Sequence, residues 1–384
     1  MTTFGIHDIE LVTTHHALDL AELARARGVD PAKFEIGLGQ TRMSVPAPDE
    51  DAVTMGATAA LRVLERHGSD RLRSLLFATE SGVDQSKSGG MFVHGLLGLP
   101  PQMRVMEFKQ ACYAGTAALQ AAIAAVARDP GAEVLVVISD VAKYELDSSG
   151  EPTQGAAAVA MLVKADPALV EIEPETGMFS AEVDDFWRPN DSTTARVDGA
   201  LSLKAYLDAL IGSWDDYAAR GGRAIEEIDR FLYHQPFTKM AVKGHQRLGR
   251  HTGADLTAEQ LETSRTYNRV LGNSYGASIY AALASLLHHE DGLEGKRIGF
   301  YSYGSGSVGE YFTGVVRPGY REHLHPEPIQ SDLAARPSIS FDEYVALHET
   351  VLSSAEDVET PRVTGAPFRF AGIRGGARQY ERNA

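Results

Sequence analysis

The chain has 384 residues, of which 43% are apolar and 23% charged, so its composition is that of a globular protein. Its 36 Lys and Arg against 52 Asp and Glu give a net charge of −16, which argues against nucleic acid or an anionic membrane as the main partner. The single cysteine, Cys112, excludes a disulfide within the chain and nearly excludes a cysteine-based zinc site. The N-terminus lacks the apolar core of a signal peptide, and the apolar runs are too short to cross a bilayer. We therefore expect a cytoplasmic protein.

Short apolar runs alternate with Ala- and Leu-rich segments of helical length. The predicted elements in chain order are a helix over Val53–Arg66, strands over Leu72–Thr79 and Arg104–Phe108, a helix over Gly115–Arg128, strands over Glu133–Ser139 and Ala156–Val163, a helix over Leu203–Arg220, a strand over Ile228–Tyr233, a helix over Ser274–His289 and a strand over Arg297–Tyr303. This alternation is typical of an α/β protein with layered sheets and helices.

Two features divide the chain. A loop-rich stretch over Pro167–Thr194 predicts a join between residues 1–166 and residues 167–384. Cys112–Thr116 and Ser274–Ser278 resemble each other, since each puts small residues ahead of an Ala-rich helix. The echo suggests two related halves, each with a buried helix at the same point. The last stretch, Arg369–Ala384, has no predicted place in the fold.

Polar side chains follow several of the predicted strands. Glu80, Cys112 and His234 each come shortly after an apolar run, and Gly304–Ser307 forms a Gly/Ser turn whose N–H groups we expect to be exposed. In α/β sheets, ligand-binding groups gather beyond the carboxyl ends of the strands. The sequence therefore predicts one crevice that contains Glu, Cys and His.

Cys112 is expected at the first turn of the helix over Gly115–Arg128. Unpaired N–H groups there would lower the pKa of the thiol and could bind the oxyanion of a thioester intermediate. The alternative is that Cys112 is a small buried apolar side chain, which is common for a lone cysteine.

Two further side chains suit acid–base chemistry. His234 could donate a proton or a hydrogen bond to a substrate carbonyl, or could be a core histidine bonded to backbone. Glu80 could be a partly desolvated base with a raised pKa, or a surface or helix-capping glutamate.

A basic segment follows His234. The stretch Arg230–Ala254 contains five Lys and Arg residues and no Asp or Glu. Such a surface could bind the phosphates of an anionic handle such as coenzyme A, or could be a solvated helix face paired with acids elsewhere. The sequence shows no fingerprint of a mononucleotide or dinucleotide site and no spacing typical of a metal site.

Taken together, the motifs resemble the 3-hydroxy-3-methylglutaryl-coenzyme A synthase family in its compact bacterial form. The matching stretches are Ala78–Lys87, Lys109–Tyr113, Gly150–Ala156, Asp185–Pro189, His234–Lys239, Gly272–Tyr275 and Tyr303–Glu310. Two departures are Ala114-Gly115, where the family usually has two glycines or Gly-Ala, and a missing Thr after Tyr275.

The resemblance implies a thiolase-type fold, with five layers αβαβα built from two similar halves, usually as a homodimer. It implies that residues 1–166 carry Glu80 and Cys112, and that residues 167–384 carry His234. Cys112 would be acetylated by acetyl-coenzyme A, Glu80 would remove a proton from the acetyl group and act again in hydrolysis, and His234 would orient acetoacetyl-coenzyme A. Coenzyme A esters are then substrates, and no cofactor or metal is implied.

The resemblance also implies further substrate contacts. Asn273 and Ser307 would line the acetoacetyl site, Ser307 partly through its backbone N–H, and Lys239 and Lys243 would contact the phosphates of coenzyme A. The full set of implied substrate-binding residues is Asn273, Ser307, Tyr144, Phe186, Lys239, Lys243 and Gly306.

Three alternatives stay open. A sister enzyme of polyketide β-branching would use the same triad with acyl groups on a carrier protein. A β-ketoacyl synthase or thiolase relative is disfavoured because those enzymes lack the Glu80 motif. A non-catalytic acyl-binding protein on the same fold is disfavoured by the intact Cys112, Glu80 and His234.

Overall fold

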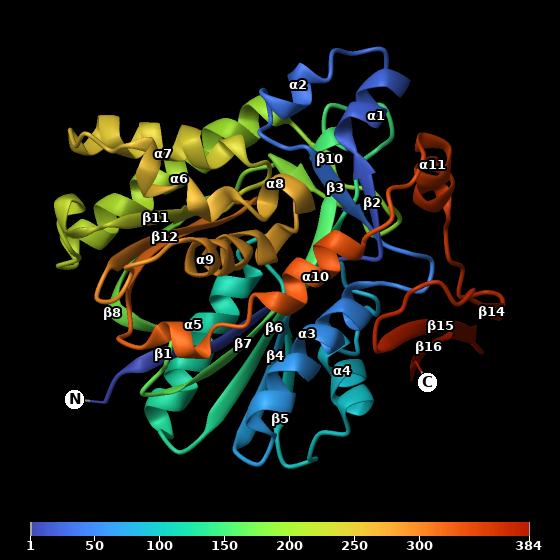
Figure 1. The fold of residues 1–384 in the computed structure, drawn as a ribbon, viewed down its shortest axis with the longest axis horizontal. Coiled ribbons are helices and arrows are strands. Elements are labelled where there is room, and N and C mark those ends of the chain that lie inside the picture. Colours follow the sequence, from blue (N-terminus) through green and yellow to red (C-terminus); the bar gives the residue numbers. More distant parts are fainter. Residues whose placement is uncertain (1, 384) are drawn as a thin grey trace.

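The computed structural model describes residues 2–383, and a nine-stranded mixed sheet runs through its centre (Figure 1). The strand order is β11-β12-β13-β8-β1-β7-β6-β4-β5. These strands are, in chain order, β1 (Phe4–Val12), β4 (Leu72–Ala78), β5 (Arg104–Phe108), β6 (Glu133–Ala142), β7 (Gly155–Ala165), β8 (Val170–Ser180), β11 (Arg230–Tyr233), β12 (Arg297–Gly304) and β13 (Val308–Val316). Smaller sheets contain β2 (His16–Asp19) with β3 (Arg42–Val45), β9 (Phe186–Trp187) with β10 (Arg196–Val197), and β14 (Val358–Glu359) with β15 (Phe368–Arg374) and β16 (Ala377–Arg382).

The helices cover this sheet on both faces. They are α1 (Leu20–Ala26), α2 (Ala32–Glu35), α3 (Ala52–His67), α4 (Gly89–Leu97), α5 (Ala114–Arg128), α6 (Gly199–Ala219), α7 (Lys239–Thr252), α8 (Asn268–Leu271), α9 (Ser278–His289), α10 (Glu327–Ala335) and α11 (Phe341–Glu349). Within residues 2–383, every helix is too short or too polar to be a candidate for crossing a membrane.

The sheet consists of two halves with the same arrangement. In the first half, β4 pairs parallel with β6, β6 antiparallel with β7, and β7 antiparallel with β1. In the second half, β11, β12, β13 and β8 repeat these pairings in the same order. The halves meet where β1 pairs with β8 over only Gly5 and Ile6. The two related halves that the echo suggests are therefore present in the strand topology.

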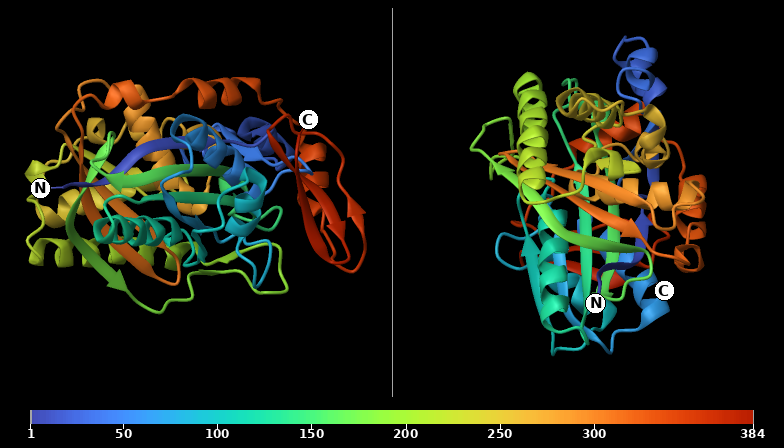
Figure 2. Two further views of the ribbon diagram at one scale, coloured as in Figure 1. Left: turned by 90° about the horizontal axis from the view of Figure 1, so that it is seen from below. Right: turned by 90° about the vertical axis from the view of Figure 1, so that its left-hand side faces the viewer.

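Helices and half-sheets alternate in five layers (Figure 2). Helix α3 packs on β1, β6 and β7, α5 and α9 lie between the half-sheets, and α6 packs on β8 and β13. Side chains alternate between the two faces of a strand, as the two-residue period requires. In β6, Val136 and Ile138 join the central core, whereas Leu135 and Val137 face α3. This is the thiolase-type arrangement, and it is confirmed by the comparisons reported below.

The two central helices meet closely at their N-terminal ends. A methyl group added at Gly115 would lie 3.2 Å from the carbonyl oxygen of Gly276, and one added at Gly276 would lie 3.3 Å from that of Cys112. The small residues in both echo segments therefore let the two helix ends, and the cysteine between them, approach one another.

The predicted elements are confirmed, with corrections at some boundaries. Pro167–Thr194 is only partly loop, because β8 occupies 11 of its residues and β9 occupies two. The helix predicted from Ser274 begins at Ser278, after a 3₁₀ turn over Tyr275–Ala277. Strands β1 and β13 were not predicted.

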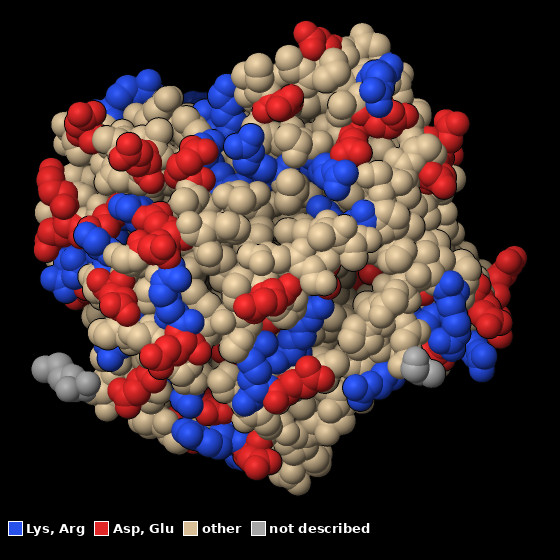
Figure 3. Space-filling model, viewed as in Figure 1, with Lys and Arg blue, Asp and Glu red and all other residues tan. Residues whose placement is uncertain are grey.

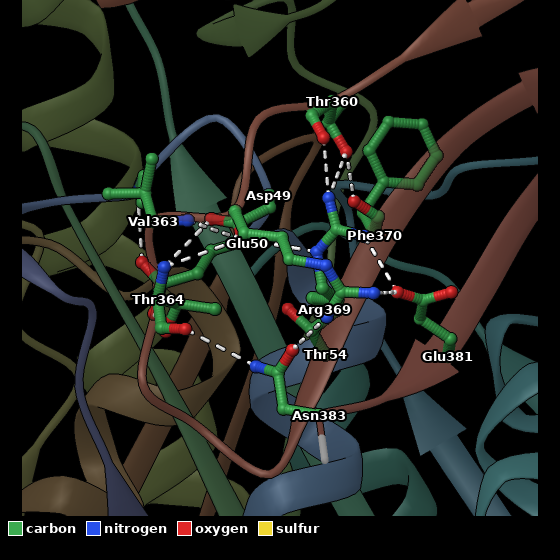
Figure 4. A network of polar contacts seen from close by, with 12 residues as sticks. Asp49, Glu50, Thr54, Thr360, Val363, Thr364, Arg369, Phe370, Glu381 and Asn383 are labelled. Carbon is green, nitrogen blue, oxygen red and sulfur yellow. Dashed lines mark hydrogen bonds and ion pairs between the residues drawn. The ribbon is translucent and has the colours of Figure 1, made fainter.

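The C-terminal stretch forms the hairpin β15–β16, which packs beside α3 and α4. A polar network ties this hairpin to the loop before α3 (Figure 4). Asp49, which is fully buried, accepts hydrogen bonds from the N–H groups of Val363 (2.9 Å) and Thr364 (3.1 Å) and pairs with Arg369 at 3.4 Å. The end of the chain is thus a fixed part of the first half.

Candidate functional site

Cys112 lies between β5 and α5, where it is 7% exposed. Its thiol donates a hydrogen bond to Oε1 of Glu80, with the Sγ and Oε1 atoms 3.0 Å apart. A buried thiol in direct contact with a carboxylate fits nucleophilic chemistry in which the carboxylate takes the thiol proton.

The expected lowering of the thiol pKa is wrong for the free enzyme. Burial, and then the neighbouring Glu80 carboxylate, raise the pKa of Cys112 well above its usual value. The helix begins only at Ala114, with Tyr113 as its N-terminal cap, so Cys112 lies just outside the first turn. The thiol is therefore neutral at rest and must lose its proton during the reaction.

Glu80 follows the end of β4. Burial, together with the negative charge of Asp140, raises the pKa of Glu80 to about 8. The raised pKa predicted from the sequence is confirmed. A carboxyl that titrates near neutral pH can both accept and return a proton.

Asp140, near the end of β6, holds the loop that carries Glu80. Its Oδ1 accepts hydrogen bonds from the hydroxyl group of Thr79 (2.8 Å) and the N–H groups of Glu80 (2.8 Å) and Ser81 (3.1 Å). Its Oδ2 accepts a hydrogen bond from the N–H of Gly276 at 3.3 Å. Asp140 therefore fixes the Glu80 loop and connects it to the second half of the chain.

Asp140→Asn should shift the pH dependence of Glu80. Because the negative charge of Asp140 raises the pKa of Glu80, its removal lowers that pKa. We expect the rate of any step in which Glu80 removes a proton to rise as Glu80 ionises. The midpoint of that rise should move to lower pH by roughly one unit in single-turnover measurements. A midpoint equal to that of the unsubstituted enzyme would show that Asp140 does not tune Glu80.

His234 follows β11, so Glu80 and His234 lie at equivalent strand ends in the two halves. Burial lowers the pKa of His234 to about 3, so its ring is neutral. Ser278 Oγ accepts a hydrogen bond from the N–H of Gln235 (3.1 Å) and lies 2.7 Å from Nδ1 of His234. We infer that Ser278 donates to Nδ1, which leaves the ring proton on Nε2. The neutral ring of His234 can then donate a hydrogen bond from Nε2. Because its pKa is low, the imidazolium form that could donate a proton is scarcely populated near neutral pH.

A pocket of about 180 Å³ brings most of the predicted residues together. Six of them line it: Cys112, Tyr144, Phe186, His234, Lys243 and Asn273. The amide of Asn273 donates to the hydroxyl oxygen of Tyr144 at 3.3 Å and accepts from the N–H of Tyr275 at 2.9 Å. The rings of Tyr144, Phe186 and Tyr275 lie around the thiol with centroids 5.9–6.5 Å apart.

Four predicted residues lie outside the lining of this pocket: Glu80, which lines a neighbouring cavity, and Lys239, Gly306 and Ser307. The N–H of Ser307 donates to the carbonyl oxygen of Ala181 (2.6 Å), and the N–H of Gly306 donates to Asp185 (2.9 Å). The prediction that this turn exposes its N–H groups is therefore wrong for these two. Lys239 donates from Nζ to the carbonyl oxygen of Ile36 at 3.2 Å, which places it beside α2.

Two backbone positions beside the site adopt left-handed conformations that are uncommon for residues with a side chain. Ala111, next to Cys112, has φ 43°, and Tyr275 has φ 46°. Such conformations raise the energy by roughly 1–3 kcal/mol and persist where the surroundings enforce them. The two positions flank the buried cluster in which Cys112 of one half and Tyr275 of the other pack together.

The sequence reasoning missed Asp140, Ser278 and Tyr275 as site residues. Asp140 carried a usable signal, since it directly follows the apolar run of β6, as Glu80 does after β4. Tyr275 is part of the matching stretch Gly272–Tyr275, but its contact with Cys112 of the other half comes from the fold. The role of Ser278 depends on its contact with His234, 44 residues earlier in the chain.

The comparisons with known proteins cover the whole chain. Residues 2–168 match the model described as "Hydroxymethylglutaryl-coenzyme A synthase N terminal", and residues 172–252 and 250–359 match the corresponding C-terminal model. A hydroxymethylglutaryl-CoA synthase of Enterococcus faecalis is 38% identical over 98% of this chain and 99% of its own. A polyketide biosynthesis 3-hydroxy-3-methylglutaryl-ACP synthase of Bacillus subtilis is 34% identical, over 90% of this chain and 88% of its own. The solved structure of MvaS in complex with 3-hydroxy-3-methylglutaryl coenzyme A matches with a TM-score of 0.93 and 38% identity, covering all of both chains.

Proposed function

Because the chain belongs to the hydroxymethylglutaryl-coenzyme A synthase family, we propose that it condenses acetyl-CoA with acetoacetyl-CoA and water to give 3-hydroxy-3-methylglutaryl-CoA and CoA. The observation that carries the proposal is the Cys112 thiol 3.0 Å from Glu80, in a pocket that it shares with His234. A thiol, an adjacent base and a hydrogen-bond donor are what acyl transfer followed by carbon–carbon bond formation requires.

In the first step, Glu80 takes the proton of Cys112 as the sulfur attacks the thioester carbonyl of acetyl-CoA. The bond between that carbonyl carbon and the CoA sulfur breaks, and Glu80 passes the proton to the departing thiolate. The high pKa of Cys112 makes this assistance necessary, because the free thiol carries little thiolate near neutral pH.

In the second step, the ionised Glu80 removes a proton from the methyl group of acetyl-Cys112. The resulting enolate attacks the ketone carbon of acetoacetyl-CoA, and the electrons of the C=O bond move to its oxygen. That oxygen accepts a hydrogen bond from Nε2 of His234 and takes up the proton that Glu80 removed from the methyl group, which leaves Glu80 ionised again. Hydrolysis of the remaining thioester to Cys112 releases the product. Coenzyme A esters are substrates throughout, and we assign no separate cofactor.

The test is to mix the protein with acetyl-CoA and acetoacetyl-CoA and to follow the loss of the acetoacetyl-CoA enolate absorbance. We expect turnover that depends on both esters. A protein that binds both but consumes neither would be the non-catalytic acyl-binding alternative.

The second candidate function is polyketide β-branching with acyl groups on a carrier protein, which the Bacillus subtilis relative favours. The proposed catalytic residues serve both reactions equally. Assays with acetyl-CoA and with acetyl-carrier protein, at equal concentrations, distinguish the two. Preference for the free ester assigns the enzyme to the mevalonate pathway of isoprenoid synthesis.

Lys243→Glu should raise KM for coenzyme A esters more than it lowers kcat. Lys243 lines the pocket, with its Nζ 5.2 Å from the centre of the Phe237 ring. Reversal of one charge beside a phosphate or pantetheine group should raise KM roughly tenfold. Steady-state kinetics with Arg250→Glu, an exposed change on the same helix, provides the control. A fall in kcat at constant KM would show that Lys243 does not contribute to substrate binding.

We also propose that the enzyme is a cytoplasmic homodimer. Strand β5 is at the edge of the sheet, and its Met106 is 44% exposed, so a second copy has an open strand to cover. A catalytic thiol needs a reducing compartment. In Figure 3, acidic and basic side chains are mixed over the visible face. Such a mixture does not favour the binding of a polyanion across the whole face.

A further inference from the structure

A second and larger cavity lies beside the catalytic pocket. Its volume is about 420 Å³, and its wall includes Glu80, the segment Val141–Lys143 at the end of β6, and residues of α11. The smaller pocket, of about 180 Å³, contains Cys112 and His234 on its wall. Phe186 and Tyr275 line both spaces, so these two aromatic rings form a partition between them.

The partition separates the two catalytic partners. Cys112 lines the smaller pocket and Glu80 lines the larger cavity, although Sγ and Oε1 are only 3.0 Å apart. Glu80 is partly exposed, whereas Cys112 is 7% exposed and packed against Tyr144, Phe186 and Tyr275. Solvent in the larger cavity can therefore reach the base while the aromatic rings cover the sulfur.

The wall of the larger cavity is mostly apolar, but charged side chains are set into it. It includes the charged residues Glu50, Lys143 and Arg188, and Lys143 is half-buried. Arg188 donates to the carbonyl oxygen of Glu80 at 2.9 Å. Apolar cavities stay dry, but a cavity of this size with charged groups on its wall holds many waters. The network of Figure 4 fixes one side of it, because Glu50 accepts hydrogen bonds from the backbone N–H of His15 (2.9 Å) and the hydroxyl group of Thr364 (3.0 Å).

We propose that this cavity is the route by which water reaches Glu80 for the hydrolysis of acyl-Cys112. The inference rests on the proposed function. In that step, Glu80 takes a proton from a water molecule whose oxygen attacks the thioester carbonyl carbon. The carbon–sulfur bond then breaks, and the Cys112 thiolate takes the proton back from Glu80. On the proposed function, the pantetheine arm of coenzyme A occupies the smaller pocket, which Cys112 lines, so water needs a separate entrance. The partition then slows the attack of water on acetyl-Cys112 before condensation.

The test measures how fast labelled acetyl-Cys112 loses its acetyl group in enzyme variants. Ala195, which is 5% exposed, lines the cavity and packs beside the partition, so Ala195→Phe should fill the end of the cavity nearest Glu80. Leu347→Trp narrows the cavity from the partly exposed side of α11. We expect each change to slow deacetylation roughly tenfold. Ala346→Phe, an exposed change on the same helix, should leave the rate unchanged. Phe186→Ala, which opens the partition, should speed deacetylation roughly tenfold.

The outcomes separate the two proposals. The acetyl group is installed with acetyl-CoA and, in parallel, with S-acetyl-N-acetylcysteamine, which lacks the nucleotide handle. If only the small thioester acetylates the unsubstituted enzyme, the proposed function fails but the deacetylation rates still test the route. The stoichiometry of Cys112 acetylation shows which variants are folded. Rates in Leu347→Trp and Phe186→Ala equal to that of the unsubstituted enzyme would overturn the water route, whatever Ala195→Phe does.

Discussion

The Cys112→Ala variant is expected to take up no acetyl group from radiolabelled acetyl-CoA. The methyl group of Ala cannot form a thioester, and the chain has no other cysteine to replace it. Overall turnover should fall by roughly 10⁴-fold or more, as for other enzymes that lose their nucleophile. Ala142, Tyr144 and Tyr275 pack against residue 112, and the smaller Ala side chain fits among them, so the variant should fold.

The measurement is the amount of acid-stable radiolabel that is bound to the isolated protein after a short incubation with labelled acetyl-CoA. Because Cys112 is the sole thiol, iodoacetamide labelling of the parent enzyme, blocked by acetyl-CoA, provides a positive control. Label recovered on Cys112→Ala in amounts near one per chain would assign the acetyl group to another residue.

The Glu80→Ala variant should separate acetylation from condensation. The thiol loses its adjacent base, so acetylation slows, but the thiol can still react once it ionises to solvent. Condensation requires removal of a far less acidic methyl proton, for which the described residues of the pocket offer no second base as close to the sulfur. We expect the condensation rate to fall roughly 10²–10⁴-fold.

Single-turnover experiments on the pre-acetylated variant measure this step directly. Glu182→Ala, at an exposed glutamate, is the control for a general loss of charge. If acetyl-Glu80→Ala enzyme condensed with acetoacetyl-CoA at the parent rate, Glu80 would not be the base and Asp140 would be the next group to examine.

The continuous apolar strands made the core of the fold predictable. Strands β4, β6 and β7 are buried on both faces over most of their length, so each contains an unbroken apolar run followed by a polar residue: Leu75–Ala78, Val134–Ile138 and Ala156–Val163. That pattern also identifies Glu80. His234 occupies the equivalent strand end in the second half. The rule that ligand-binding groups follow the carboxyl ends of strands therefore predicts both Glu80 and His234.

Strand β1 was missed because its sequence contains His7, Asp8 and Glu10, which look like surface residues. In the structure Asp8 and Glu10 are buried and pair with Arg66 of α3, at 2.8 Å and 3.0 Å. Buried charges are stable only with such partners. No pattern local to the strand contains that information, because the partner lies more than 50 residues away.

The direction of the pKa shift of Cys112 was predicted wrongly for a similar reason. The helix N-terminus was visible in the sequence, but the burial of the thiol and its contact with Glu80 come from tertiary packing. These two effects outweigh the field of the helix end. The same limit applies to Ser307 and Gly306, whose backbone N–H groups are bonded to Ala181 and Asp185.

The polar network around Asp49 has a consequence for how the chain is made. Residues 363–369 supply the partners of a carboxylate that the ribosome produces more than 300 residues earlier. Until the last strands emerge, Asp49 is a buried charge with its partners missing, or its loop stays open to water. The first half therefore completes its structure only after residues 363–369 have left the ribosome. A C-terminal deletion that removes β15 should yield a protein that aggregates on the way to its fold, even though every proposed catalytic residue is still present.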